Sequence, residues 1–238
     1  MKQIMIVFLL LPTLIWSQSN FEKAQKLFEA QKLFEAQKFD KAETLFESVL
    51  KEKPSDLKAI EYLGDIATQN KEWDQAVGYY KKLKQLKPSG ANYFYKYGAA
   101  LGMKALGVSK FKAFGMIDEV RGSFEQAIVL NPKHIEARWA LIELNLQLPG
   151  IAGGSQSKAI KYSDELLKLS PIDGYLSRGH IDEYFKRYLD AERQYKHAII
   201  VSKSKASYQM LANLYQKKMN QPEKAKTTLE EYKRTSIN

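Results

Sequence analysis

The sequence predicts an all-α protein, a right-handed superhelical solenoid of about six antiparallel helix hairpins. Two observations carry this prediction. A pattern of aromatic, small and apolar residues recurs along the 238-residue chain, and its apolar positions lie three and four residues apart, the spacing of amphipathic helices. In the first copies the pattern returns after 34 residues, which is typical of a helix hairpin repeat.

The second helix of each hairpin carries the clearer pattern. FDKAETLFESVLKEKP ends at Pro54, and WDQAVGYYKKLKQLKP ends at Pro88. Another helical pattern precedes each copy, as in residues 57–68 and 207–218. A proline after the second helix is expected to stop it and to start the next hairpin. Two further copies end at Pro132 and Pro171, and two more are centred on Ala191 and Ala225.

Small residues mark where paired helices cross, because close interaxial distances require small side chains at the contact. Gly64 is expected to be such a crossing point on a first helix. The corresponding positions on second helices are Ala42, Ala76, Ala159, Ala191 and Ala225.

This pattern resembles the tetratricopeptide repeat (TPR) family over residues 21–235. The residues that carry the resemblance are Ile60, Leu63, Gly64, Ala67, Ala76, Tyr80, Leu83 and Pro88. The resemblance implies that the first helix of each hairpin lines a concave groove that binds an extended peptide or a partner helix.

The resemblance also implies the groove residues. They are Lys58, Glu61 and Asp65 in the second hairpin, Tyr95 in the third, Trp139 and Glu143 in the fourth, and Arg178 and Asp182 in the fifth. Trp139 is the leading candidate, since tryptophan often anchors interfaces; the alternative is a core position. Glu61 and Asp65 would repel a carboxylate, which disfavours capture of a partner's C-terminus.

The third hairpin departs from the 34-residue period, because Pro88 and Pro132 lie 44 residues apart. The inserted residues keep a helical pattern on both sides of Gly107. We therefore expect both helices of this hairpin to be longer, with Ser109 capping the second. Near the N-terminus, the duplicated QKLFEA of residues 25–36 is expected to lengthen the first helix, with one copy packed and the other partly exposed.

The stretch LPGIAGGSQSKA contains Pro149, Gly150, Gly153, Gly154 and Ser155. A phosphate-binding loop would need Gly-Lys-Ser/Thr after a strand, and here the order is different and a helix precedes. We interpret the stretch as a structural turn in which Ser155 caps the next helix. An extended third hairpin followed by such a turn resembles an exported bacterial TPR variant.

Catalytic and metal-binding residues are not grouped in the sequence. There is no cysteine, and His134, His180 and His197 are widely separated, whereas metal sites need clustered ligands. Adjacent acids, such as Asp118 and Glu119, point in different directions on a helix. We therefore expect no cofactor and no enzymatic activity.

Residues 1–17 read as a secretory signal peptide: Lys2, an apolar run from Ile4 to Trp16, and a small residue, Ser17. Residues 18–238 would then be an exported repeat domain, periplasmic or extracellular, without a transmembrane segment. The leading interpretation is a non-catalytic scaffold of the cell envelope with an unidentified protein or peptide partner. The formal net charge of +10 supports the alternative, a polyanion- or membrane-surface-binding protein that uses its lysine-rich helices; export argues against nucleic acid.

Overall fold

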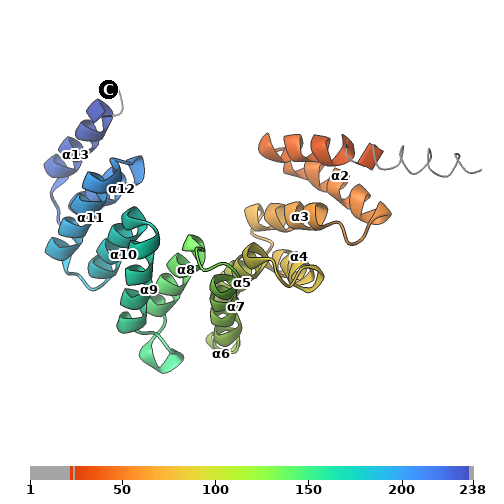
Figure 1. The fold of residues 1–238 in the computed structure, drawn as a ribbon, viewed down its shortest axis with the longest axis horizontal. Helices are drawn as coiled ribbons and strands as arrows, with labels where there is room; N and C mark the ends of the chain where they lie inside the picture. Colours follow the sequence, from red (N-terminus) through yellow and green to blue (C-terminus); the bar gives the residue numbers. More distant parts are fainter. Residues whose placement is uncertain (1–21, 24, 236–238) are drawn as a thin grey trace, which may run out of the picture. The chain divides into compact units, whose positions relative to one another are not determined.

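The computed structural model describes residues 22–23 and 25–235. In this part of the chain all regular structure is helical, with helices stacked in antiparallel pairs (Figure 1), and the predicted all-α solenoid of helix hairpins is confirmed. The predicted signal peptide lies outside the described residues. The described chain divides into two compact units, the first ending at Val108 and the second beginning at Ser109.

Unit 1 starts with helical residues 25–35 and continues with α2 (Phe39–Glu52), α3 (Leu57–Gln69), α4 (Trp73–Leu86) and α5 (Ala91–Leu106). Its core includes Phe46, Val49 and Ile66. In the duplicated N-terminal segment, Leu27, Leu33 and Phe34 pack against this core, whereas Phe28 is 61% exposed. The second copy therefore packs both its leucine and its phenylalanine, whereas the first copy packs Leu27 and leaves Phe28 exposed.

Unit 2 contains α6 (Lys110–Phe114), α7 (Ile117–Leu130), α8 (Ile135–Gln147), α9 (Gln156–Leu169), α10 (Pro171–Tyr184), α11 (Tyr188–Ser202), α12 (Lys205–Lys217) and α13 (Pro222–Thr235). From α7 onwards, each helix packs on the next. In addition, α10 contacts both α8 and α12, so the first helices of the last three hairpins form one continuous layer.

Small residues lie at the helix crossings, as the pattern predicted. Ala42, Ala76, Ala159 and Ala191 have no exposed surface, and Ala225 is also buried. At Gly64 the approach is close, because an added Cβ would lie 2.6 Å from the Tyr80 ring. Likewise, an added Cβ at Gly179 would lie 2.4 Å from the Tyr195 ring. The sequence pattern did not single out this glycine.

The third hairpin differs from the prediction. Its first helix, α5, is longer, with 16 residues against 13 in α3. The second is interrupted at Gly115, so the insertion forms the separate short helix α6, and α7 keeps 14 residues, as α4 does. Ser109 occupies the N-cap position of α6, but its side chain makes no capping hydrogen bond. The expectation of a continuous, lengthened second helix capped by Ser109 was wrong.

The fifth hairpin begins without the expected loop. Ser170 is at once the C-cap of α9 and the N-cap of α10, and Pro171 is the first residue of α10. By contrast, α3 begins three residues after Pro54, and α8 begins three residues after Pro132. Proline fits the first helical turn, where its missing N–H costs nothing. Positions counted from Pro171 are therefore out of register with the other hairpins.

Candidate partner-binding surface

The first-helix face of unit 1 carries a partly buried ion-pair network. The Lys96 Nζ of α5 donates to Glu61 Oε1 at 2.7 Å and to Asp65 Oδ1 at 2.7 Å, and the Tyr80 hydroxyl donates to Asp65 Oδ1 at 2.7 Å. Burial disfavours the charge of Lys96, but its hydrogen bonds and Coulomb attraction to Asp65 and Glu61 outweigh this and raise its pKa. Two predicted groove acids are thus engaged within the protein.

The other predicted groove residues of unit 1 are more accessible. Lys58 is exposed and Tyr95 is half-buried. Lys58 lies three residues before Glu61 and seven before Asp65, so the three residues share one face of α3. This face combines one exposed cation with two acids that Lys96 neutralises in part.

Trp139 lies partly in the core and partly at the surface. Its ring packs against both apolar clusters of unit 2, and its Nε1 donates to Asp173 Oδ1 on α10 at 2.9 Å. The side chain is half-buried. One side of the indole therefore packs in the core while the residue keeps an accessible surface, and its role as an interface anchor stays a prediction.

Glu143 and His180 form a second link between α8 and α10. The His180 Nε2 and Glu143 Oε2 are 2.8 Å apart, and their side chains are 31% and 50% exposed. The hydrogen bond to Glu143 raises the pKa of His180, although burial opposes this. The same bond lowers the pKa of Glu143. Both shifts favour the charged pair.

Arg178 and Asp182 do not lie on this face. Arg178 pairs with Asp164 of α9. Asp182 is only 7% exposed, and its Oδ1 accepts from Arg187 Nη2 at 2.7 Å and from Arg187 Nε at 2.8 Å. The shortened connection at Pro171 explains the misplacement. Neither side chain is presented to a ligand in the predicted groove.

When α10 is aligned on Gly179, His180 occupies the position that was assigned to Asp182, and Asp173 occupies the position that Lys58 has in α3. Sequence reasoning missed them, but one signal could have found them. Gly179 and Tyr195 are separated by the same number of residues as Gly64 and Tyr80, and each glycine packs on its tyrosine ring. Aligning α10 on Gly179 rather than on Pro171 would have made His180 the equivalent of Asp65.

The resulting surface of unit 2, here called the acidic face, consists of Glu136, Trp139 and Glu143 of α8 with Asp173 and His180 of α10. The arginines of these two helices are Arg138 and Arg178, and both turn towards α9. Arg138 Nε donates to Glu165 Oε2 at 2.9 Å, and Arg178 pairs with Asp164. The acidic face therefore carries three carboxylates around an indole, and its one basic side chain from α8 or α10 is His180, which pairs with Glu143.

The glycine-rich stretch after α8 has the geometry of a tight turn. Residues Gly150–Ala152 form a short 3₁₀ helix, and Gly153 adopts a left-handed φ of +82°. A Cβ on Gly154 would lie 1.8 Å from the Leu148 carbonyl oxygen. The Ser155 hydroxyl accepts from the Lys158 N–H at 3.3 Å and caps α9, and Pro149 lies at the N-cap of the 3₁₀ helix.

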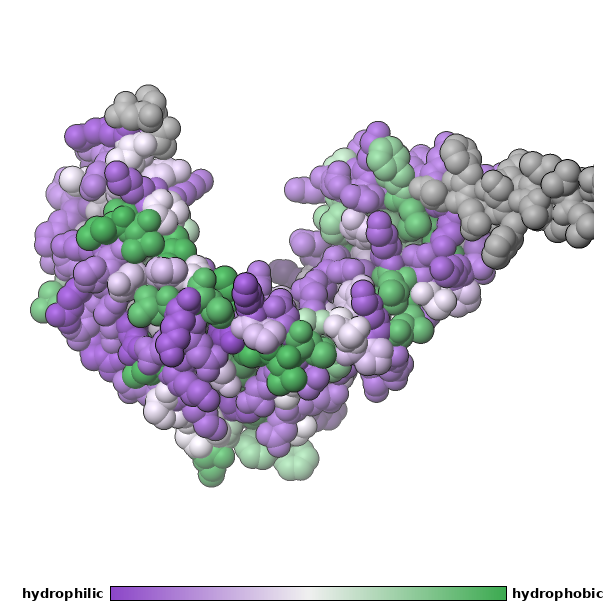
Figure 2. Space-filling model, in the orientation of Figure 1, coloured by the Kyte–Doolittle hydropathy of each residue, from purple (hydrophilic) through white to green (hydrophobic). Residues whose placement is uncertain are grey.

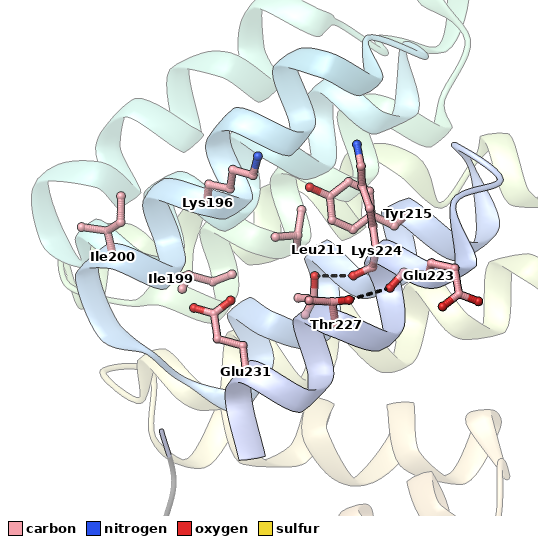
Figure 3. A pocket seen from close by; sticks show the side chains of 10 residues that line it. Lys196, Ile199, Ile200, Leu211, Tyr215, Glu223, Lys224, Thr227 and Glu231 are labelled. Carbon is pink, nitrogen blue, oxygen red and sulfur yellow. Dashed lines mark hydrogen bonds between the residues drawn. The ribbon is translucent and has the colours of Figure 1, made fainter. Parts of the chain in front are cut away.

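A hollow of about 520 Å³ lies among α11, α12 and α13. Figure 3 shows Ile199, Ile200, Leu211 and Tyr215 around it, with Lys196, Glu223 and Glu231 also lining it. The charged side chains are of both signs, so they select no class of ligand by charge.

Among the described side chains, no three His, Asp or Glu residues lie close enough together to bind a metal ion. No helix in residues 22–23 and 25–235 is long and apolar enough to cross a membrane.

Comparison with known proteins places the fold. Tetratricopeptide repeat profiles match residues 27–91 and residues 206–235. Among curated protein sequences, none matches the chain significantly.

Several solved structures share the architecture. A thermophilic TPR protein of Thermus thermophilus is 17% identical, with a TM-score of 0.61, over 87% of this chain and 98% of that one. PilF of Pseudomonas aeruginosa is 16% identical, with a TM-score of 0.61, over 91% and 92% of the two chains. YrrB, a TPR protein with an unusual peptide-binding site, is 15% identical, with a TM-score of 0.53, over 76% and 87%. The chain therefore contains segments that match tetratricopeptide repeats at residues 27–91 and 206–235, and it shares the fold of TPR proteins across most of its length.

Proposed function

We propose that this protein is a non-catalytic scaffold of the cell envelope, and that its acidic face binds an extended segment or helix of a partner protein that carries basic residues. The observation that carries the proposal is the arrangement around Trp139. Its indole is held by Asp173, while the two arginines of α8 and α10 are turned away to α9. Complementary charge steers and orients a partner more than it adds affinity, and the indole offers an apolar anchor.

Known TPR proteins support binding rather than catalysis. YrrB, which shares the fold, is described as having a peptide-binding site. The continuous layer of α8, α10 and α12 supplies a surface long enough for an extended segment. The three carboxylates of the acidic face would repel the C-terminal carboxylate of a partner, so we do not expect this face to bind a chain end.

Photo-crosslinking tests the location of the partner. A photoreactive residue in place of Gln209, which is exposed on α12, should capture a protein from the envelope fraction. The same residue in place of Val129, which is 71% exposed on the second helix α7, should not. Equal capture from both positions would contradict binding on the first-helix layer.

Single charge changes test the chemistry. Glu143→Gln and Asp173→Asn should each lower capture several-fold, whereas Arg178→Gln, which alters a side chain turned to α9, should leave it near the native level. If none of the three changes affects capture but moderate salt abolishes it, the result would instead support the alternative of a diffuse polyanion-binding surface.

We also propose that the protein acts outside the cytoplasm, with residues 1–17 as its signal peptide. Cell fractionation with an intact mass measurement tests this. A chain recovered from the cytoplasm with residues 1–17 attached would contradict it.

A further inference from the structure

Three apolar side chains of unit 2 protrude far into solvent. Phe111 on α6 is 90% exposed, Phe114 on the same helix is 59% exposed, and Ile151 in the turn after α8 is 91% exposed. Single exposed apolar residues are ordinary on protein surfaces. These three are unusual because they lie on two neighbouring segments, the short helix α6 and the turn after α8.

A hydrogen-bonded arginine links the two segments. Arg121, in the second turn of α7 and thus just after α6, donates from Nη2 to the Gly153 carbonyl oxygen at 3.1 Å and from Nη1 to Asn145 Oδ1 at 3.3 Å. Figure 1 shows α6 and the turn after α8 at the same, lower end of unit 2, and Figure 2 shows apolar surface at this edge. We call Phe111, Phe114 and Ile151 the apolar tip.

Backbone hydrogen bonds fix the turn that carries Ile151. The turn around Ile151 is closed by hydrogen bonds from the Ala152 and Gly154 N–H groups to the Pro149 carbonyl oxygen, at 2.8 and 3.1 Å. A side chain on Gly154 would collide with the Leu148 carbonyl. The exposure of Ile151 is therefore built into the turn.

Lysines alternate with the aromatic residues of the tip. Lys110 and Lys112 flank Phe111, and residues 109–117 contain no Asp or Glu; Asp118 and Glu119 follow in α7. Apolar side chains such as phenylalanine enter the boundary between the lipid headgroups and the acyl chains, and lysines near them are attracted to anionic lipids. Protruding side chains suit a soft apolar layer, whereas a protein partner would need a matching cavity for each.

We propose that the apolar tip inserts into the headgroup region of an anionic lipid bilayer and docks unit 2 on a membrane surface. This site is separate from the acidic face, so either can exist without the other. Docking by the tip leaves the first-helix layer to bind a partner at the membrane.

A labelled cysteine provides a local test. The full chain has no cysteine, so Phe111→Cys gives one site for an environment-sensitive fluorophore. Its emission should shift to the blue with phosphatidylcholine vesicles that contain phosphatidylglycerol, and should be quenched by lipids that carry a quencher. A label at Leu189→Cys is the matched control, because Leu189 is 75% exposed on α11. Residues 4–16 are apolar and could bind lipid themselves, which is why a local readout is required.

The outcomes separate the alternatives. A label at position 111 that stays unchanged with anionic vesicles would overturn the proposal, as would an equal response at position 189. A response to protein concentration without vesicles would overturn it in favour of a second copy as the occupant. Independently, the double change Phe111→Ser and Phe114→Ser should lower the vesicle affinity reported by a label at Ile151→Cys about a hundredfold, since burial of each apolar side chain contributes on the order of a factor of ten.

Discussion

At the residue scale, the N-cap of α8 is a histidine, His134, whose capping hydrogen bond depends on its protonation state. His134 caps α8 by accepting from the Ala137 N–H at Nδ1, at 3.3 Å, a role that requires this nitrogen to be unprotonated. Asp56 occupies the equivalent place in α3, where its carboxylate accepts from the Ala59 N–H at 3.2 Å. Burial lowers the pKa of His134, although Glu136 opposes the shift.

We expect the His134 cap to weaken in acid. Its pKa in the folded state lies below the unfolded value, so its stabilisation is present at neutral pH and is lost as the pH falls below the ordinary histidine pKa. His134→Asn keeps a capping oxygen without this titration. Urea unfolding should therefore show that His134→Asn gains stability relative to the native chain between pH 7 and pH 5. His180→Gln is the control with the opposite sign, because the pKa of His180 is raised; the same trend in both variants would contradict the assignment.

At the element scale, two glycines inside helices should respond in opposite directions to alanine. Gly122 lies in α7, and a Cβ there meets nothing within 4 Å, so Gly122→Ala should stabilise unit 2 by about 0.5–1 kcal/mol. At Gly179 a Cβ would lie 2.4 Å from the buried Tyr195 ring, whose hydroxyl is held by Glu183 at 3.0 Å. Gly179→Ala should cost about 1–3 kcal/mol through overpacking. Urea unfolding of both variants checks this, and a neutral Gly179→Ala would show that the crossing can relax.

The sequence pattern succeeded at this scale where the period is regular. Helix spacing and small residues predicted the hairpins from α3 to α13, and placed Trp139 and Glu143 on one face of α8. It failed at α10 because a proline that follows a helix and one that begins a helix look alike in sequence. Two left-handed turn residues, Lys71 and Lys186, also gave no signal, because lysine does not favour this conformation. Local hydrogen bonds at the helix ends accompany it, from the Glu72 N–H to the Ala67 carbonyl oxygen and from the Arg187 N–H to the Asp182 carbonyl oxygen, both at 2.8 Å.

At the scale of the whole molecule, the insertion in the third hairpin coincides with a division of the stack. The first unit ends at Val108, between α5 and α6, and the second begins at Ser109. In a repeat array each element is stabilised by its neighbours. A change in one unit should therefore propagate through the packed helices of that unit before it reaches the other.

Hydrogen exchange on the Gly179→Ala variant tests this division. Overpacking between α10 and α11 should destabilise these two helices and the helices that pack on them. Amide exchange should therefore become faster in each of the helices α8 through α12. Exchange in α2, α3 and α4 should stay at the native level, because contacts cluster within each unit and local openings follow contiguous cooperative segments. Gly122→Ala is the control, since it should slow exchange or leave it unchanged in α7. Faster exchange throughout residues 39–86 in Gly179→Ala would mean that the helices unfold as one cooperative body despite the division at Val108.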